Sequence, residues 1–387
     1  MAAKVKLVLF YQNYENWTGG TYYLQNLLQA LATLPAKDAP EISILTEKIA
    51  DFYPLQALCP QIQLHFQPLK AEYTLFQRVV NKISRAFSRR NFFEKRPVAD
   101  FIFPLQTPSW NYLTELCKTR IFWIPDFQEE YLPHFFSPQD LSDRKIARSI
   151  LAAQAKALLL SSEAAKADFC RFYPDAQRCP TFVLPFAVTH DLVYKNLNIN
   201  HLREKYQLPK LYFFAPNQFW QHKNHQLILD AVLYLKEKNV LVNVAFSGKE
   251  YDFRNPDYTH KLKNFVKNKG LENQCFFLGF IDRAEQLQLM NCAQAVLQAS
   301  LFEGWSTVVE DAKAMNQYIL ASDLPVHREQ LLQNGEFFNP QHTNELADLL
   351  QKYAVEKPQI KLLDYSQNVQ KFAANFIQIL SQIDFKS

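Results

Sequence analysis

The sequence predicts an α/β protein built from two doubly wound parallel sheets. Short apolar runs, typical of buried parallel strands, alternate along the chain with longer runs that are apolar at helical spacing. Glycine is scarce, and five of the seven glycines follow or end strand-like runs. Open α/β sheets bind nucleotides at that edge, so this distribution indicates a ligand site. The 387 residues suffice for two such domains.

In the N-terminal half we expect a strand at 4–11 and then a helix through residue 34 that Gly19 and Gly20 open. A glycine pair can also serve only a turn. Asp126 directly follows the strand expected at 120–124, where α/β enzymes place ligand-binding side chains, although such a residue also caps turns. The other strands expected in this half are 41–45, 62–66, 100–105 and 157–160, and the segment 182–188 is expected to lead out of the domain.

A polar stretch near residue 190 predicts the linker, so the expected domains are 1–190 and 191–364, with a last helix in 365–387. The strands expected in the second domain are 211–215, 240–247, 275–278, 295–299, 319–321 and 336–338.

The segment 300–312 joins the strand expected at 295–299 to a helix. The first N–H groups of a helix lack intrahelical partners and carry partial positive charge, so they suit a diphosphate. Gly304 permits a tight turn, and Glu303 and Glu310 offer acceptors for sugar or ribose hydroxyls. The alternative is structural, because Thr307-x-x-Glu310 also has the spacing of a capping box.

Residues 303–310, Glu-Gly-Trp-Ser-Thr-Val-Val-Glu, resemble the E-x7-E signature of family 4 glycosyltransferases. These are retaining enzymes of the two-domain GT-B fold that use nucleotide-sugar donors. The segments 277–280 and 319–329 are also similar to that family. The resemblance covers about residues 210–340, and the N-terminal half matches only in outline.

The resemblance implies a role for each matching residue. Glu310 would hold the ribose hydroxyls and Glu303 the sugar, while Lys223 would neutralise the leaving diphosphate. Asp126 would bind the acceptor or take part in catalysis. The last helix would cross back to the N-terminal domain. The other donor-binding residues expected are Gly304, Trp305, Ser306, Thr307, Asn217, Gln218, Gly279, Phe280, Arg283, Gly19 and Gly20.

Two positions depart from the family pattern. The arginine that usually precedes the lysine is absent, with Asn217 and Gln218 near its place, so Arg283 is a candidate substitute. Pro125-Asp126 stands where many members carry His or His-Asp. These departures leave open a degenerate donor site.

The segment 73–96 predicts a basic amphipathic helix with trailing aromatic residues. Its apolar positions recur at helical spacing, and arginines and lysines occupy much of the remainder. Such a helix either lies on an anionic membrane surface or packs on the sheet with a solvated basic face.

Composition excludes several other classes of protein. A net charge of +4 is too small over this length to indicate nucleic-acid binding. The six cysteines show no CxxC spacing and no signal peptide is recognised, so we expect reduced thiols and a cytoplasmic protein. Asp-x-Asp, P-loop and Gly-x-Gly-x-x-Gly motifs are absent, and His222 and His225 lack a third metal ligand. We expect no metal and no cofactor.

The function predicted is metal-independent transfer of a sugar from a nucleoside-diphosphate sugar to an acceptor hydroxyl of a glycan or lipid-linked glycan. Retention of configuration is implied by the resemblance alone. The alternatives are a nucleotide-sugar epimerase, which needs no acceptor, and a nucleotide-sugar-binding scaffold without catalysis.

Overall fold

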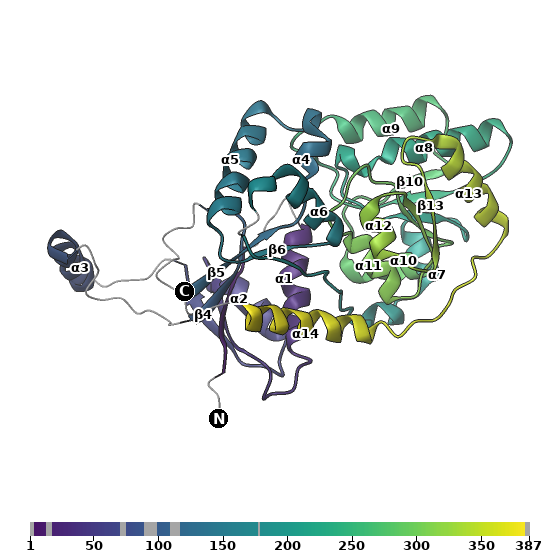
Figure 1. Ribbon diagram of the computed structural model, residues 1–387. Coiled ribbons are helices and arrows are strands. Elements are labelled where there is room, and N and C mark those ends of the chain that lie inside the picture. The colour runs from purple at the N-terminus through teal and green to yellow at the C-terminus, as the bar shows by residue number, and fades with distance from the viewer. Residues whose placement is uncertain are drawn as a thin grey trace.

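The protein consists of two α/β domains that lie side by side (Figure 1). The structure is a computed structural model that describes residues 4–12, 18–69, 75–88, 99–108, 117–176 and 179–383. Every paired strand in both sheets is parallel. The predicted fold class is therefore confirmed.

The N-terminal sheet has seven strands in the order β3-β2-β1-β4-β5-β6-β7. Its strands are β1 (Lys6–Phe10), β2 (Glu41–Thr46), β3 (Leu64–Pro68), β4 (Ala99–Leu105), β5 (Cys117–Ile124), β6 (Leu158–Leu160) and β7 (Thr181–Val183). The helices of this half are α1 (Thr18–Leu31), α2 (Ile49–Leu58), α3 (Leu75–Ser88), α4 (Gln128–Tyr131), α5 (Pro138–Gln154) and α6 (Glu163–Phe172). The strand order reverses between β1 and β4, where doubly wound sheets form a crevice.

The C-terminal sheet has six strands in the order β10-β9-β8-β11-β12-β13. Its strands are β8 (Phe213–Ala215), β9 (Val244–Phe246), β10 (Cys275–Phe277), β11 (Val296–Gln298), β12 (Ile319–Ser322) and β13 (Gly335–Phe338). The helices are α7 (Ile199–Lys205), α8 (His225–Glu237), α9 (Tyr258–Asn268), α10 (Arg283–Asn291), α11 (Thr307–Ala314), α12 (Pro325–Gln330), α13 (Thr343–Val355) and α14 (Ser366–Gln382). Here the order reverses between β8 and β11.

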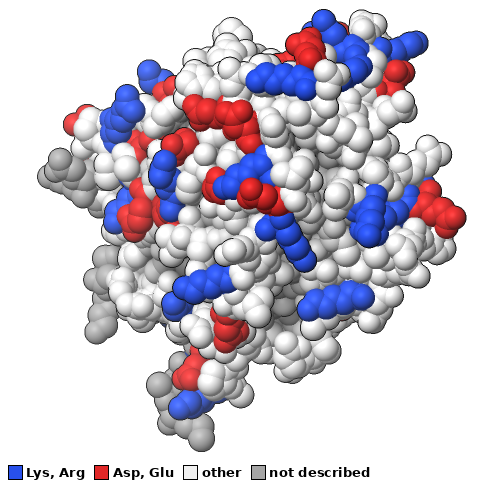
Figure 2. Space-filling model, turned by 90° about the vertical axis from the view of Figure 1, so that its right-hand side faces the viewer, with Lys and Arg blue, Asp and Glu red and all other residues white. Residues whose placement is uncertain are grey.

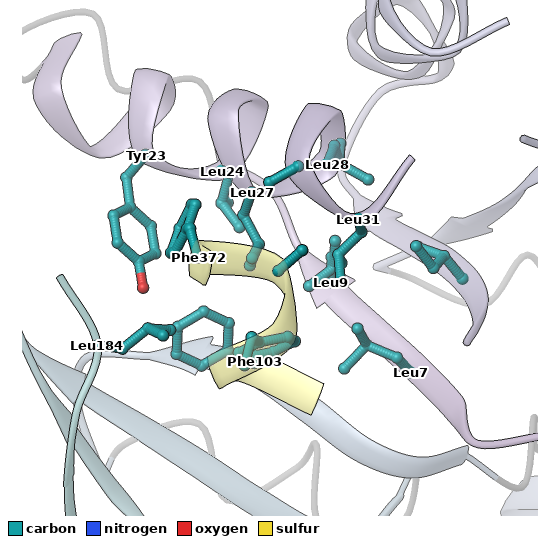
Figure 3. Close-up of a cluster of buried hydrophobic side chains, with 14 of the residues drawn as sticks. Leu7, Leu9, Tyr23, Leu24, Leu27, Leu28, Leu31, Phe103, Leu184 and Phe372 are labelled. Atoms are coloured by element: carbon teal, nitrogen blue, oxygen red, sulfur yellow. The ribbon is translucent and has the colours of Figure 1, made fainter. Parts of the chain in front are cut away.

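Helix α14 follows the second domain in the chain but packs on the first (Figure 1). Its residues Phe372 and Phe376 are buried with Leu7, Leu9 and Phe103 of the N-terminal sheet, beneath the apolar face of α1 (Figure 3). The Phe103 and Phe376 rings lie 5.3 Å apart. The chain therefore passes twice between the two domains.

The segment 182–188, which is expected to lead out of the domain, begins within β7. β7 ends at Val183, although Leu184 and the residues Phe186–Val188 are buried. Pro185 has no N–H to continue the pairing with β6, and β7 lies at the edge of the sheet.

Helix α3 stands apart from both domains (Figure 1). It covers Leu75–Ser88 of the predicted amphipathic segment, and residues 73, 74 and 89–96 lie outside the described part of the chain. The exposed fractions of Phe76, Val79 and Ile83 are 69%, 55% and 55%. Of the two alternatives for this helix, packing on the sheet is not observed, because these three apolar side chains face solvent.

Charged side chains of both signs are interspersed over the face of the molecule in Figure 2, with uncharged surface between them. No single-sign patch dominates this face. Within the described ranges, no helix is long and apolar enough to cross a bilayer.

We expect Phe376→Ala to lower the free energy of unfolding by about 3–5 kcal/mol, because it leaves a cavity between α14 and the N-terminal sheet. Denaturant unfolding followed by fluorescence measures this change. Gln378→Ala, on the exposed side of the same helix, is the matched control and should change stability by less than about 0.5 kcal/mol. Equally small effects would contradict a core role for α14.

Candidate functional site

A cleft of about 440 Å³ lies between the two domains, at the carboxyl ends of their strands. The loops after β8 and β11 supply its C-terminal wall, on either side of the point where the strand order reverses. The start of α1 and the loop after β5 supply the opposite wall. The site therefore occupies the position that both sheets predict for a ligand.

Most of the residues predicted for the site line this cleft. They are Gly19, Asp126, Asn217, Gln218, Lys223, Phe280, Arg283, Glu303, Gly304, Trp305, Ser306 and Thr307. Gly20, Gly279 and Glu310 do not line it. Gly20 lies within the first turn of α1, and Gly279 has a φ of +70°, which fits a turn.

The turn before α11 is capped one residue earlier than the capping-box alternative predicts. The Ser306 side chain accepts a hydrogen bond from the Val309 N–H, whereas the Ser306 N–H donates to Gln330 Oε1 at 3.1 Å. The N–H groups of Thr307 and Val308 have no hydrogen-bond partner in the described part of the chain, and both residues line the cleft. They are the donors that remain for an anion.

Glu303 and Lys223 form an ion pair within the cleft, with 2.6 Å between Nζ and Oε1. The same carboxylate oxygen accepts hydrogen bonds from Gln298 Nε2 and Ser300 Oγ, each at 2.7 Å. Both partners of the ion pair are largely buried. The structure thus brings together two residues that lie eighty positions apart in the chain.

The structure contradicts the expected placement of Glu310 at the donor. The Glu310 side chain is 1% exposed, and its carboxylate bonds to Lys313, Gln330 and Tyr365. It lines a second cavity, of about 560 Å³, which shares Trp305 with the cleft. Successive residues of a helix point about 100° apart, so the next residue, Asp311, faces the cleft instead.

The spacing of the family signature also leads to Asp311. Seven residues, 304–310, separate Glu303 from Asp311, whereas only six separate Glu303 from Glu310. The correct spacing is easily overlooked, because Asp311 stands at the second position of the signature where a glutamate is expected, and the glutamate Glu310 is directly beside it. Counting alone could have found it.

Asp311 is held by two bonds to one of its oxygens. Arg283 Nη2 lies 2.6 Å and His190 Nε2 lies 2.9 Å from Oδ1. Burial opposes ionisation of Asp311, but Arg283 and His190 outweigh it and hold the pKa of the carboxyl below its ordinary value. Asp311 is therefore an anion, and within the described part of the chain no hydrogen bond reaches its second oxygen, Oδ2.

Asn217 and Gln218 lie in the cleft as predicted, but neither carries charge. The basic side chains that line the cleft are Lys223, Lys249 and Arg283. Since Arg283 is bonded to Asp311, it compensates that carboxylate before any diphosphate arrives. Its guanidinium carbon also lies 5.2 Å from the centre of the Tyr22 ring, across the domain boundary.

Asp126 and Pro125 lie directly against Gly304 of the C-terminal domain. A Cβ built on Gly304 would lie 2.2 Å from the Pro125 carbonyl oxygen and 2.7 Å from Asp126 Cβ. Burial, and then the nearby Glu129 carboxylate, raise the pKa of Asp126 above its ordinary value. Glycine at 304 thus allows a carboxyl with a raised pKa to stand beside the Glu303 loop.

Other contacts hold the two domains face to face. Trp305 Nε1 donates to the Phe186 carbonyl at 3.0 Å, and the rings of Tyr131 and Phe302 lie 5.1 Å apart. The Glu329 carboxylate accepts the N–H groups of Glu163 and Ala164 at the start of α6. These contacts come from separate elements, so the two domains meet at several points around the cleft.

Several cleft residues were missed by the sequence reading. The clearest are Tyr22, Tyr23, Trp123, Ser161, Phe186, Trp220 and His222. His222 was considered only as a metal ligand, and the aromatic residues carry no motif. Across the described residues, no three His, Cys, Asp or Glu side chains gather in a group that could hold a metal ion.

Residues 198–372 match the model of the family described as glycosyl transferases group 1. This match covers less than half of the chain and includes all six strands of the C-terminal sheet. Over 150 residues the chain is also 25% identical to O-antigen chain mannosyltransferase RfbU of Salmonella typhimurium. That match covers 38% of this chain and 40% of the mannosyltransferase, so the chain aligns with less than half of this relative's length.

Solved structures resemble the whole chain. HepE of Anabaena, solved with UDP and glucose, superposes with a TM-score of 0.60 at 18% identity, covering 98% of this chain and 96% of HepE. Sucrose-phosphate synthase of Thermosynechococcus elongatus gives 0.62 at 14% identity, covering 98% and 95%. Together with the two doubly wound sheets, these likenesses establish the GT-B fold.

Gly304→Ala should force the domains apart, because its Cβ would overlap the Pro125 carbonyl. Overpacking of this kind costs about 1–3 kcal/mol, and here it would destabilise the arrangement in which the two domains touch at Gly304. Small-angle X-ray scattering should show a larger radius of gyration. Gly270→Ala, at a positive-φ turn after α9, should cost stability and leave the radius unchanged. An unchanged radius in both variants would contradict the contact.

Proposed function

We propose that the protein is a glycosyltransferase that moves a sugar from a nucleoside-diphosphate sugar to an acceptor hydroxyl, without a metal and with retention of configuration. The observation that carries the proposal is the Lys223–Glu303 pair, which faces the cleft beside the free N–H groups of α11. The family match of the C-terminal part supports the reaction type. The UDP bound to HepE, a protein of the same fold, supports a nucleotide in the cleft.

The C-terminal domain would bind the donor. The N–H groups of Thr307 and Val308 and the Lys223 ammonium would receive the diphosphate, because each presents positive charge to the same part of the cleft. Developing negative charge on the leaving group would be stabilised by these groups without large rearrangement. Their arrangement supports metal independence, since the protein itself supplies the positive charge.

The two acidic residues of the signature would have separate roles. Glu303 would accept hydrogen bonds from the sugar hydroxyls, and Asp311, in place of Glu310, would accept a ribose hydroxyl through Oδ2. The acceptor would enter from the N-terminal side, where Asp126 lies next to Gly304. A raised pKa suits Asp126 to receive a proton from the attacking hydroxyl.

Asp311→Asn should weaken nucleoside-diphosphate binding by about 10-fold or more, because a neutral amide loses the charge-assisted bond to ribose. The measurement is a thermal-shift screen against UDP, GDP, dTDP and ADP, with each variant compared with its own ligand-free melting temperature. A ligand present at 100 times its Kd stabilises the native state by about 2.7 kcal/mol.

Glu310→Gln is the decisive comparison, because the sequence pattern and the geometry disagree about this residue. The geometry predicts lower stability from the disturbed contacts with Tyr365 and Lys313, and an unchanged ligand-induced shift. Loss of the shift in Glu310→Gln alone would restore Glu310 as the ribose ligand. If no nucleotide stabilises the unaltered protein, the scaffold alternative gains, and conversion of a donor to its epimer without acceptor would indicate an epimerase.

Helix α3 suggests where the acceptor lies. The segment 75–93 contains five basic residues (Arg78, Lys82, Arg85, Arg89 and Arg90) and no acidic one, and α3 exposes apolar side chains. This combination suits an anionic bilayer, in which the apolar face enters the headgroup region. We propose that α3 holds the enzyme at the inner face of the plasma membrane, where a lipid-linked glycan would be the acceptor.

Vesicle co-sedimentation tests this surface. The protein should bind vesicles that contain 30% phosphatidylglycerol better than phosphatidylcholine alone, and added salt should weaken binding. The double variant Val79→Ser, Ile83→Ser should reduce binding about 10-fold or more, since both apolar contacts are lost. Leu241→Ser, at an exposed leucine of the other domain, is the matched control. Equal binding of all three proteins would overturn the membrane assignment.

A further inference from the structure

Arg254 contacts both domains and bonds to two residues that line the cleft, Gln128 and His222. Its Nη1 donates to Gln128 Oε1 of α4 at 3.1 Å, and its guanidinium carbon lies 5.1 Å from the centre of the Phe136 ring. On its own domain, Nε lies 3.4 Å from the buried Asp252 carboxylate. The orientation of this guanidinium is therefore fixed from two sides.

The remaining arm of Arg254 determines which nitrogen of His222 carries the proton. Nη2 lies 3.2 Å from His222 Nδ1. A guanidinium has only donors, so Nδ1 must accept. Burial, and then the charges of Lys223 and Arg254, hold the pKa of His222 well below its ordinary value, so the ring is neutral. A neutral ring that accepts at Nδ1 carries its proton on Nε2.

His222 belongs to the wall of the cleft that also carries Glu303. Trp220 and Lys223, its near neighbours in the sequence, line the cleft with it. Its carbonyl accepts the Leu301 N–H at 2.8 Å, which ties the residue to the loop that carries Glu303. No described residue bonds to Nε2, and this atom is not fully buried. It is a fixed donor open to a ligand.

We propose that His222 is a specificity-determining residue that donates Nε2–H to an oxygen of the transferred sugar, and that Arg254 is a positioning residue that fixes the donating tautomer. The proposal rests on the proposed function, because it needs a sugar donor in the cleft. A hydroxyl both donates and accepts hydrogen bonds. Glu303 offers the sugar acceptors only, and His222 adds a donor on the same wall.

The test compares binding of UDP and UDP-glucose by calorimetry, or the corresponding pair if another nucleotide stabilises the protein. His222→Asn removes the donor at the Nε2 position, because its amide reaches only as far as Nδ1. We expect about 10-fold weaker binding of the sugar conjugate, the effect of one lost hydrogen bond, with UDP binding unchanged within about 2-fold. His222→Gln, whose amide nitrogen reaches the Nε2 position, should retain most of the affinity.

The binding results distinguish failure of the proposed role of His222 from failure of the proposed function. Equal losses for UDP and UDP-glucose in both variants would mean that His222 only supports the fold, and no loss for UDP-glucose in His222→Asn would also overturn the proposal. In both cases UDP still binds the unaltered protein, so the proposed function stands. If neither ligand binds the unaltered protein, the proposed function fails and this inference fails with it.

Nitrogen-15 spectra of the histidine rings report which ring nitrogen is protonated, a property that would not change if Arg254 only packed against the ring. At pH 7 the His222 ring should show a protonated Nε2 and an unprotonated Nδ1 in the ligand-free protein. Arg254→Gln should leave UDP binding unchanged, weaken UDP-glucose binding by a few fold and mix the two tautomers, because the enforced acceptor role of Nδ1 is lost. A protonated Nδ1 in the unaltered protein would refute the assignment.

Discussion

The site depends on how closely the two domains approach each other at Gly304. Each sheet by itself offers loops at its carboxyl edge, and neither set contains a complete site. The missing Cβ at 304 lets the C-terminal loop meet the backbone of Pro125 and Asp126. Charged groups of the two domains then line one cleft, where their partial burial makes interactions between charges stronger than at the surface.

Within that cleft most of the charges are already compensated. Lys223 faces Glu303, and Arg283 faces Asp311, with separations of 2.6 Å in each pair. A buried charge without a partner is costly, so the pairs allow the site to exist without a ligand. A diphosphate that enters would compete with Glu303 for Lys223 and leave the carboxylate free for hydroxyl groups.

Contacts outside the cleft maintain this arrangement. Helix α14 returns the chain to the first domain, and Glu329 of the second domain caps the start of α6 in the first. A carboxylate at a helix N-terminus is favoured by the free N–H groups and by the helix dipole. Arg254 adds a third link, which connects domain closure to the orientation of the His222 ring.

The sequence by itself determined the fold class, most of the strands and the turn at 303–307, because apolar period, glycine placement and helix-start chemistry are local properties. It also indicated Lys223 and Glu303 for one site, through their motifs. Only the tertiary structure decided which of the adjacent acids, Glu310 or Asp311, meets the cleft, since that depends on how α11 is rotated against its neighbours. The tautomer of His222 was likewise decided by Arg254, thirty-two residues away, because a proton position depends on a partner that no local pattern specifies.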